Sequence, residues 1–278
     1  MVQKRMEKDQ KNVWGDLMIE LTHLSLFSGI GGADLAAEWA GFTTVGQCEW
    51  ADYPTKVLEK HWPNVPRWKD IRTLTKESFY EKTGLRTVTL ISGGFPCQPH
   101  SVVGKHKASN DERDLWGELF RVFCDIGAEW LVAENVYGLL SSENGRFFGR
   151  VLRDLANVGC NAWWYCFPSK ATGTLFEGKR IAIVASPNSI GRGRMVENQE
   201  IKPDGKYLEM LGKWKTRQDN TLSYPKRIKP SASSRIKRND DGVPDALDRL
   251  KCLGNAIVPQ QFYPIFKAIA DIETGNII

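Results

Sequence analysis

The sequence predicts an α/β protein with a Rossmann-like, mostly parallel sheet and helices on both faces. Short and almost continuously apolar runs alternate along the chain with longer amphipathic runs. Such apolar runs are typical of strands covered on both sides, and the alternation is typical of strand–helix–strand units. Turns rich in glycine or proline follow several of the apolar runs. In open parallel sheets ligands bind at those strand ends, so we expect the functional residues there.

Each expected element has its own signal. The expected strands are short and apolar, and they span Leu21–Phe27, Thr43–Cys48, Thr87–Ile91, Leu131–Ala133, Ala162–Phe167 and Arg180–Ala185. The expected helices are longer and amphipathic, and they span Ala33–Ala40, Pro54–His61, Leu115–Ile126 and Phe147–Asn157. A last helix is indicated by four apolar residues on one helical face, Phe262, Ile265, Phe266 and Ile269. We expect this helix to pack back onto the sheet.

Composition divides the chain into three parts. Residues 1–20 are polar and lysine-rich, and we expect a poorly ordered leader or a short helix. Residues 187–247 are rich in Pro, Gly, Ser, Asn, Lys and Arg and have little periodicity. A loop of that length is unusual inside a compact domain, so we expect a small separate module. Residues 21–186 and 248–278 then form the main domain.

Positive charge is concentrated in the expected module. The whole chain has 38 Lys and Arg against 33 Asp and Glu, a formal net charge of +5. Between Pro187 and Asn239 there are thirteen basic and five acidic residues, so the rest of the chain is slightly acidic. A basic segment on a nearly neutral body suits an acidic polymer such as nucleic acid. The alternative is a solvated lysine-rich loop.

Composition also restricts location and metal content. No apolar run approaches the roughly 20 residues that span a bilayer, and the N-terminus has no signal-peptide core. The six cysteines are scattered, without a C-x-x-C pair or a zinc spacing. We therefore expect reduced thiols in a cytoplasmic protein without a membrane segment or a metal site.

The stretch G-F-P-C-Q-P-H-S, from Gly94 to Ser101, is the most informative part of the chain. It holds Cys97 between two prolines, directly after the expected strand Thr87–Ile91. Prolines restrict their own backbone and that of the preceding residue, so the turn is rigid. A rigidly aimed thiolate at a strand end is placed like a nucleophile. The alternative is a tight turn that happens to contain a cysteine.

A second group of residues fits an adenosine-containing cofactor. The stretch F-S-G-I-G-G, Phe27 to Gly32, lies at the first strand-to-helix turn, where glycines allow a ligand to approach the backbone. Its glycine spacing differs from the dinucleotide pattern G-x-G-x-x-G. Glu49 can accept ribose hydroxyls, Trp50 can stack on adenine, and Asp70 can accept from the adenine amine. S-adenosylmethionine fits this set better than NAD, since no diphosphate cradle is needed.

Three further positions can carry chemistry. Glu134, in E-N-V, ends a strand expected near that of Cys97, and a shielded carboxyl there can deliver a proton. The alternative is a glutamate that caps the next turn. Arg180 enters a buried strand and needs a carboxylate or a base carbonyl as a partner. Asn255, in G-N-A-I-V-P before the last helix, can reach back to the glycine turn.

Taken in order, these blocks resemble the bacterial and phage DNA (cytosine-5)-methyltransferases. The matching pieces are F-S-G-I-G-G, E-W at 49 and 50, Asp70, G-F-P-C-Q-P-H-S, E-N-V, K-R-I-A-I-V-A and L-G-N-A-I-V-P. They cover about residues 21–186 and 248–272. The order of the Pro-Cys-Gln, Glu-Asn-Val and Gly-Asn blocks is highly specific. The implied fold is that of class I methyltransferases dependent on S-adenosylmethionine.

The resemblance implies a role for each matched residue. Cys97 is the implied nucleophile, Glu134 the acid at the ring nitrogen of the base, and Arg180 a base contact. The implied cofactor contacts are Phe27, Gly29, Gly31, Gly32, Glu49, Trp50, Asp70, Pro96 and Asn255. The polar segment Gln98–Asn110 is expected to close over a flipped-out cytosine, with substrate contacts from Gln98, Ser101, Lys105 and Lys107.

Two stretches depart from the family pattern. The family usually has Gln-x-Arg-x-Arg before the strand at 181, and the corresponding residues here are Phe176, Gly178 and Arg180. An interaction that orients the site is therefore missing or supplied from elsewhere. The usual aromatic residue after Pro-Cys-Gln-Pro is His100, a milder change.

The expected partner is double-stranded DNA, whose target sequence the module at 187–247 is expected to choose. A cognate restriction endonuclease is a further expected partner, and we expect a monomer. Two alternatives are an RNA cytosine-5 methyltransferase that acts on tRNA and a DNA-binding relative with impaired turnover. Gly94 and Phe95 before the Pro-Cys pair, together with the basic module, favour DNA over RNA.

Overall fold

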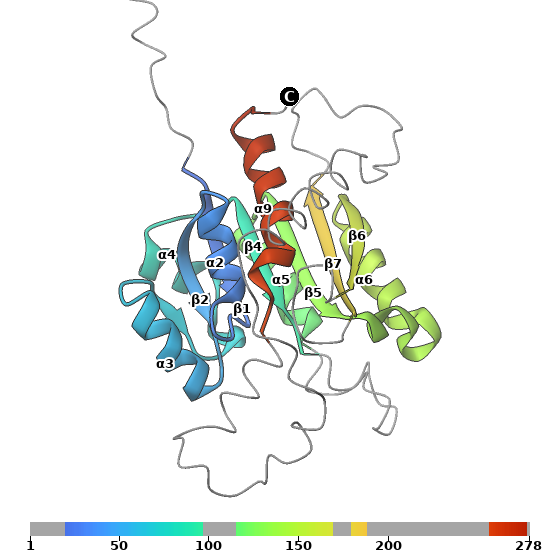
Figure 1. The fold of residues 1–278 in the computed structure, drawn as a ribbon, viewed down its shortest axis with the longest axis horizontal. Helices are drawn as coiled ribbons and strands as arrows, with labels where there is room; N and C mark the ends of the chain where they lie inside the picture. Colours follow the sequence, from blue (N-terminus) through green and yellow to red (C-terminus); the bar gives the residue numbers. More distant parts are fainter. Residues whose placement is uncertain (1–19, 97–114, 169–178, 188–255, 277–278) are drawn as a thin grey trace, which may run out of the picture.

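The computed structural model describes residues 20–96, 115–168, 179–187 and 256–276. In this part of the chain a seven-stranded sheet has the order β3-β2-β1-β4-β5-β7-β6 (Figure 1). The strands are β1 (Thr22–Leu26), β2 (Thr43–Cys48), β3 (Arg67–Trp68), β4 (Leu90–Gly94), β5 (Trp130–Val136), β6 (Cys160–Pro168) and β7 (Lys179–Pro187). The predicted Rossmann-like class is confirmed.

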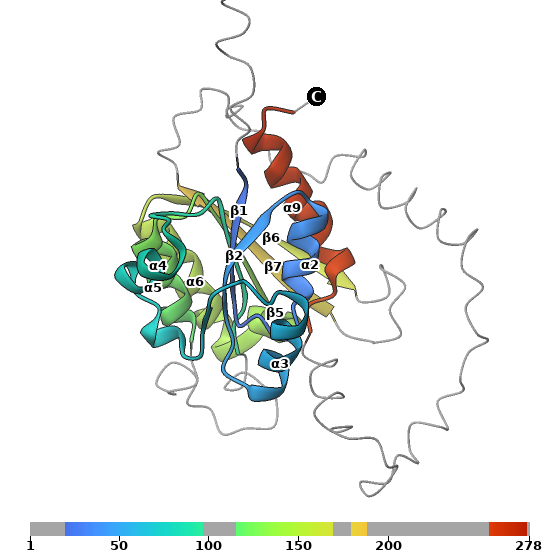
Figure 2. The ribbon, with the colours of Figure 1, turned by 90° about the vertical axis from the view of Figure 1, so that its left-hand side faces the viewer.

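Helices cover both faces of the sheet (Figure 2). They are α2 (Gly32–Trp39), α3 (Asp52–His61), α4 (Lys76–Thr83), α5 (Trp116–Ile126), α6 (Arg146–Asn157) and α9 (Pro259–Glu273). Two 3₁₀ segments, η1 (Ile71–Thr73) and η4 (Tyr137–Gly145), follow β3 and β5. None of the helices in the described ranges is long and apolar enough to cross a membrane.

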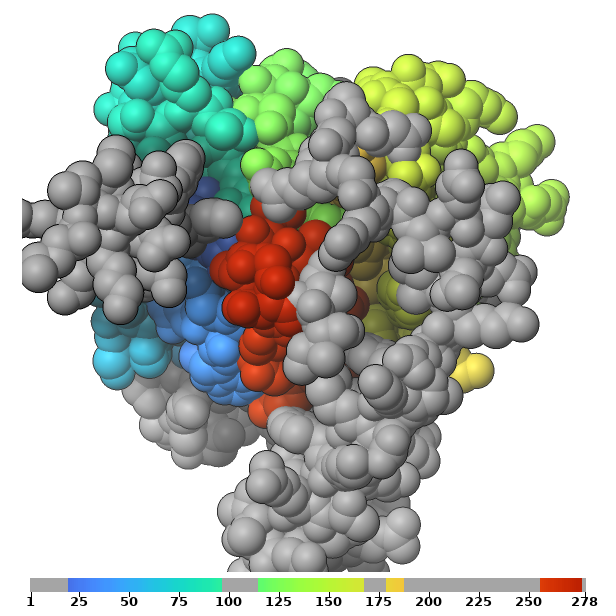
Figure 3. Space-filling view, turned by 90° about the horizontal axis from the view of Figure 1, so that it is seen from above, coloured from blue at the N-terminus to red at the C-terminus, as the bar shows by residue number. Residues whose placement is uncertain are grey.

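The core has one cluster on each side of the sheet. Side chains of α2 and α9, such as Ala36 and Phe266, form the smaller cluster, and α5 and α6 contribute to the larger one. The last helix therefore returns to the sheet, as predicted, and lies beside α2. Figure 3 shows it between the α2 side and the β6 side. Helices from the beginning and the end of the main domain, α2 and α9, therefore pack together on one face of the sheet.

Strand direction explains where Arg180 lies. β1, β2, β3, β4 and β5 are parallel, whereas β7 is antiparallel to both β5 and β6. The start of β7 therefore lies beside the end of β5, with Arg180 opposite Val136. A residue that opens an apolar strand consequently reaches the same edge as residues that end the parallel strands, the lower edge in Figure 1.

The expected leader and module lie almost entirely outside the described residues. The division into residues 1–20, 187–247 and a main domain at 21–186 plus 248–278 therefore stays a prediction. The expected strands and helices of the described part are present within a few residues of their predicted bounds, apart from the longer β5. β3, η1, α4 and η4 are additions that the apolar pattern did not indicate.

Candidate active site

The first strand-to-helix turn has an unusual backbone. Phe27 and Gly29 have positive φ values of 51° and 54°, and Gly31 has 87°. A positive φ is uncommon for a residue with a bulky side chain such as Phe27, and such outliers cluster at ligand sites. The Ser28 N–H donates to the Cys48 carbonyl at 3.0 Å, which ties this turn to the end of β2. These φ values and this hydrogen bond give the turn a fixed shape at the end of β1.

Two neighbouring segments pack tightly against the turn. A Cβ at Gly32 would lie 2.1 Å from the carbonyl oxygen of Ile257, in the segment that opens α9. A Cβ at Gly31 would lie 2.3 Å from the Trp62 ring, whose indole N–H donates to Glu38 of α2. Only glycine permits both approaches. A Cβ at Gly29, in contrast, would meet no atom nearer than 4.0 Å, so one side of the turn is open.

Glu49 joins the turns that follow β1 and β2. Its Oε2 accepts from the Gly29 N–H at 2.8 Å, and its Oε1 accepts from the Ala51 N–H at 2.8 Å. Each carboxylate oxygen has a second lone pair, so both can still accept a hydroxyl. The neighbouring Trp50 is 67% exposed, and its indole offers a face for stacking.

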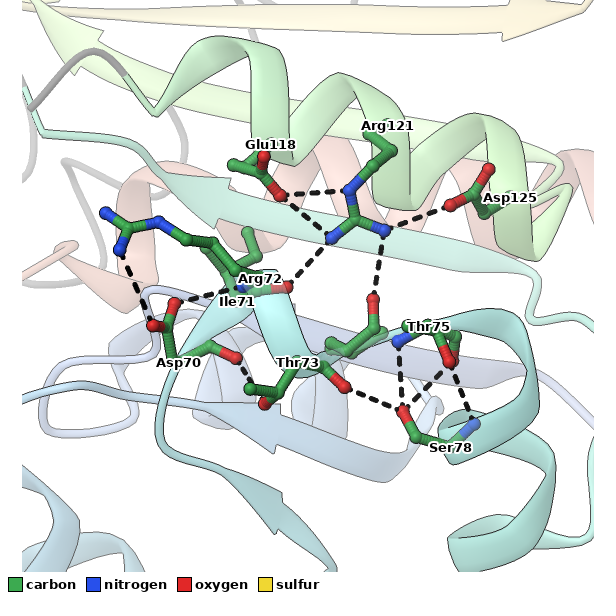
Figure 4. Close-up of polar contacts among 10 residues, drawn as sticks. Asp70, Ile71, Arg72, Thr73, Thr75, Ser78, Glu118, Arg121 and Asp125 are labelled. Carbon is green, nitrogen blue, oxygen red and sulfur yellow. Dashed lines mark hydrogen bonds and ion pairs between the residues drawn. The ribbon is translucent and has the colours of Figure 1, made fainter. Parts of the chain in front are cut away.

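Asp70 lies at the end of β3 and caps η1 (Figure 4). Its Oδ1 accepts from the Arg72 N–H at 3.0 Å, and its Oδ2 lies 3.7 Å from Arg72 Nη1. Arg121 of α5 donates to the carbonyls of Ile71 at 2.9 Å and Leu74 at 3.1 Å. Glu118 and Asp125 hold that guanidinium in place. An ion-pair network on α5 thus fixes the turn that carries Asp70.

Glu134 is the buried acid of this edge. Its residue is 7% exposed, and Arg180 Nε lies 3.4 Å from its Oε1. Burial raises the pKa of the Glu134 carboxyl to about 7, and the nearby Arg180 charge opposes that shift. A carboxyl with such a pKa can hold a proton near neutral pH and donate it.

Gly94 makes room for that carboxyl. It pairs with Glu134 across β4 and β5, and a Cβ at position 94 would lie 2.9 Å from Glu134 Oε2. The described chain continues from Gly94 through Phe95 and Pro96 and stops one residue before Cys97. Glu134 therefore lies opposite Gly94, which comes three residues before Cys97 in the sequence.

Asn135 has a role that the sequence did not indicate. This buried side chain donates from Nδ2 to the Phe95 carbonyl at 3.2 Å and accepts at Oδ1 from the Val136 N–H at 2.8 Å. Phe95 also packs against the Trp116 ring, 5.5 Å away between centroids. Asn135 thus ties the backbone before Pro96 to the strand of Glu134. Its place in E-N-V was the available signal.

Several predicted site residues lie outside the described residues. They are Cys97, Gln98, Ser101, Lys105, Lys107 and Asn255. Phe27, Gly29, Gly31 and Gly32 lie in one turn, which Glu49 contacts at the Gly29 N–H. Glu134 and Arg180 form a separate contact. Trp50 and Asp70 follow β2 and β3 at the same edge.

This set fits an adenosine-containing ligand without a diphosphate. The turn is open beside Gly29, and no cation lies in the turn itself. The groups that follow β2 and β3 are a carboxylate with free lone pairs, an exposed indole and an aspartate that caps η1. Those groups match hydroxyls, an aromatic ring and an amine rather than phosphates.

Comparison with known proteins agrees with this geometry. Residues 21–239 match the family described as C-5 cytosine-specific DNA methylase. The type II methyltransferase M.HgiCII of Herpetosiphon aurantiacus is 29% identical over 262 residues, covering 93% of this chain and 55% of that protein. M.BsuFI of Bacillus subtilis is 28% identical over 174 residues, covering 62% and 41%.

Solved structures share the fold. A DNA modification methyltransferase encoded within an Escherichia coli prophage superposes with a TM-score of 0.53 at 21% identity, covering 61% of this chain and 47% of that one. A Spodoptera frugiperda DNMT2 variant gives 0.51 at 20% identity, covering 65% and 54%. The chain spans about half the length of the curated relatives it matches. Because the family match covers most of its residues, the chain belongs to the C-5 cytosine-specific DNA methylases.

Proposed function

We propose that this protein transfers a methyl group from S-adenosylmethionine to C5 of a flipped-out cytosine in double-stranded DNA. The observation that carries the proposal is the buried Glu134 carboxyl, whose pKa is about 7, beside Arg180 and Gly94. This acid stands on the strand next to the one that leads into Cys97. Family membership supplies the reaction class.

The β1–β2 end of the edge would hold the methyl donor. Glu49 would accept the ribose hydroxyls, Trp50 would stack on the adenine, and Asp70 would accept from the adenine amine. The open side of the turn at Gly29 leaves room for the ligand. The family uses S-adenosylmethionine, which when bound supplies an electrophilic methyl group on a sulfonium.

The β4–β5–β7 end would activate the base. C5 of cytosine is a weak nucleophile, so the ring must first gain electron density. The Cys97 thiolate forms a bond to C6, while the C5=C6 pair shifts through the ring and N3 takes the proton of Glu134. Arg180 then faces the carboxylate that this transfer leaves behind, 3.4 Å from Oε1. C5 becomes enamine-like and nucleophilic. It would then bond to the methyl group while the bond from that methyl to the sulfonium sulfur breaks, which leaves a neutral thioether.

Release reverses the addition. A base removes the C5 proton, the C5=C6 bond re-forms, the C6–S bond breaks to return the Cys97 thiolate, and N3 gives its proton back to Glu134. Unstacking the cytosine costs a few kcal/mol, which the segment Gln98–Asn110 would offset by closing over the base with Gln98, Ser101, Lys105 and Lys107. The basic segment at 187–247 would choose the target sequence.

The test is a covalent trap. With a DNA duplex that contains 5-fluorocytosine, C5 carries no removable proton, so the Cys97 adduct should accumulate and be visible by denaturing electrophoresis. Cys97→Ala should form none, whereas Cys124→Ala, at an exposed position of α5, should behave as wild type. Methylation of DNA by Cys97→Ala would end this proposal.

The same assay separates the alternatives. Adducts and methyl transfer on tRNA but not on DNA would identify an RNA enzyme. Binding of DNA without adduct or transfer would identify an impaired relative, in keeping with Phe176 and Gly178 in place of Gln and Arg.

A further inference from the structure

Helix α6 carries three arginines on one face, and the first and the last of them are exposed. Arg146, Arg150 and Arg153 are spaced by four and three residues, so they share one helical face. The buried residues of the helix, Phe147, Phe148, Val151 and Leu155, occupy the opposite side. Arg146 and Arg153 are exposed, and Arg150 lies over the Phe147 ring at 4.5 Å. We name Arg146, Arg150 and Arg153 the α6 arginine row.

This row is unfavourable for the isolated helix. Arginines at i,i+3 and i,i+4 repel one another by a few tenths of a kcal/mol per pair. Arg146 also opens the helix, where the macrodipole favours acids, and the first turn contains none. Asp154, the one acid within α6, accepts from Trp116 Nε1 at 2.9 Å. Arg146 and Arg153 thus depart from the local preference of a helix, and such departures are typical of functional sites.

On two other helices of the described part, a cation pairs with an acid of the same helix. On α5, Arg121 has Glu118 at i−3 and Asp125 at i+4, both at ion-pair distance. On α9, Lys267 pairs with Asp271. In the described ranges, neither Arg146 nor Arg153 has an acid within ion-pair distance. Within those ranges, the guanidinium groups of Arg146 and Arg153 can therefore pair with an anion supplied by a partner.

The row begins at the functional edge. α6 follows β5 through η4, so its first turn lies at the end of the sheet where Glu134 and Arg180 meet. At the same edge Lys179 lies 5.0 Å above the ring of Tyr137, which is 44% exposed. From there the row runs about 10 Å along the helix, given a rise of 1.5 Å per residue. Figure 1 shows α6 at the β6 end of the sheet, with η4 at the lower edge.

We infer that the α6 arginine row binds the phosphate backbone of double-stranded DNA. The inference rests on the proposed function, and it assigns DNA contact to the main domain in addition to the basic segment at 187–247. Guanidinium groups match phosphate oxygens in geometry, and a duplex carries one charge per about 1.7 Å of its axis. Contacts of this kind position the duplex and are independent of base sequence.

The test is the salt dependence of binding. Arg146→Gln/Arg153→Gln should lower the slope of log K against log salt by about 2, because each phosphate contact contributes about 0.9. The loss should be equal on two duplexes of unrelated sequence. Lys56→Gln/Lys60→Gln removes the same charge from exposed positions of α3, at the other end of the sheet, and should leave the slope unchanged.

Further readouts distinguish the possible failures. The melting temperature of Arg146→Gln/Arg153→Gln should not fall, since like charges are removed, and affinity for S-adenosylmethionine should match wild type. A slope equal to that of wild type, in a protein that still methylates DNA, would overturn the arginine row alone. A slope change seen with duplex RNA but not with DNA would overturn it as well. Wild-type protein that neither binds nor methylates DNA would instead overturn the proposed function.

Discussion

The two ends of the functional edge are built by different means. At the β1–β2 end, the geometry rests on backbone groups: glycines pressed against Ile257 and Trp62, and N–H groups held by Glu49. At the β4–β5–β7 end it rests on side chains: a buried carboxyl, an arginine 3.4 Å from it, and Asn135. The first end is held in shape by backbone contacts, and the second contains a group whose protonation can change.

This difference suits the two tasks proposed for the edge. A ligand that is only held gains from a preorganised backbone, because less ordering is needed on binding. A base that must accept a proton gains from an acid whose pKa is near the working pH, and burial supplies that for Glu134. Substitutions at the first end should therefore act on donor affinity, and those at the second on turnover.

Glu134→Gln should have the largest effect on turnover. The amide keeps the shape but cannot donate a carboxyl proton to N3, so we expect a loss of roughly 10² or more in kcat. Affinity for S-adenosylmethionine, measured by calorimetry, should stay within about two-fold of wild type, since a shape-conserving change leaves the donor end preorganised. Glu273→Gln, a buried carboxyl at the far end of α9, is the matched control and should leave kcat unchanged. Full turnover by Glu134→Gln would remove this acid from the chemistry.

The pH dependence of the stability of Glu134→Gln tests the raised pKa of Glu134. The folded-state pKa of about 7 lies above the ordinary value of 4.5, so the folded protein binds the extra proton between these pH values. The associated stabilisation is complete below about pH 4.5 and is lost as pH rises through about 7, with a total near 3 kcal/mol. Denaturant titrations should show that Glu134→Gln lacks this part of the pH dependence. An unchanged profile would contradict the raised pKa.

Gly32→Ala should lower the affinity for the methyl donor more than it lowers turnover. The added methyl would lie 2.1 Å from the Ile257 carbonyl oxygen, so the turn or the start of α9 must move. Such overpacking typically costs 1–3 kcal/mol, and we expect donor affinity to fall about 10-fold or more. Turnover at saturating donor should fall less than for Glu134→Gln. Gly117→Ala in α5, where a Cβ meets no atom within 4 Å, should keep wild-type affinity.

The two ends also differed in how far the sequence could predict them. Periodicity predicted the strands, the terminal helix and the glycine turn, because each is a local pattern. The direction of β7 was not predictable, because an apolar run looks the same in both directions. That direction is what brings Arg180 to Glu134. The resemblance to a family, rather than periodicity, supplied the role of Arg180 as a base contact.

Contacts between segments that are distant in the sequence were the second kind of feature that the sequence could not predict. Glu49 was predicted to accept ribose hydroxyls, and the structure adds that its two oxygens already bridge Gly29 and Ala51. The Trp62 ring packs against Gly31 from the end of α3, which no spacing indicates. Likewise, the network of Arg121 around η1 depends on α5 and η1 being neighbours in the tertiary structure.

Asn135→Asp tests the side-chain contacts at the β4–β5–β7 end. Asp keeps the acceptor for the Val136 N–H but removes the donor to the Phe95 carbonyl, two residues before Cys97. A small displacement of a reacting group can cost one to two orders of magnitude in rate, and we expect about 10-fold in kcat. Adduct formation with 5-fluorocytosine DNA should slow equally, whereas donor affinity should not change. Equal losses in donor affinity and kcat would indicate a general structural effect instead.

Asp34→Asn should have the smallest effect on turnover, because it lies under the rigid end and touches no proposed ligand. The Asp34 carboxylate is buried and accepts from Ser25 Oγ at 2.9 Å and Gln47 Nε2 at 2.8 Å. Burial raises its pKa to about 6, and these hydrogen bonds oppose the shift. The folded state therefore holds an extra proton between about pH 4 and 6, so stability from this group is lost as pH rises through about 6.

Asn removes that titration without breaking the cluster. Gln47 Oε1 is buried and has no hydrogen-bond partner in the described part of the chain. Rotating the Gln47 amide turns that oxygen toward position 34, where an Asn side chain offers an N–H. Stability should then be independent of pH in this window, and kcat should stay within about two-fold of wild type, because side chains remote from the reacting atoms add little to transition-state binding. A large fall in kcat would show that the donor end is less rigid than its backbone contacts imply, and the contrast between the two ends would lose its physical basis.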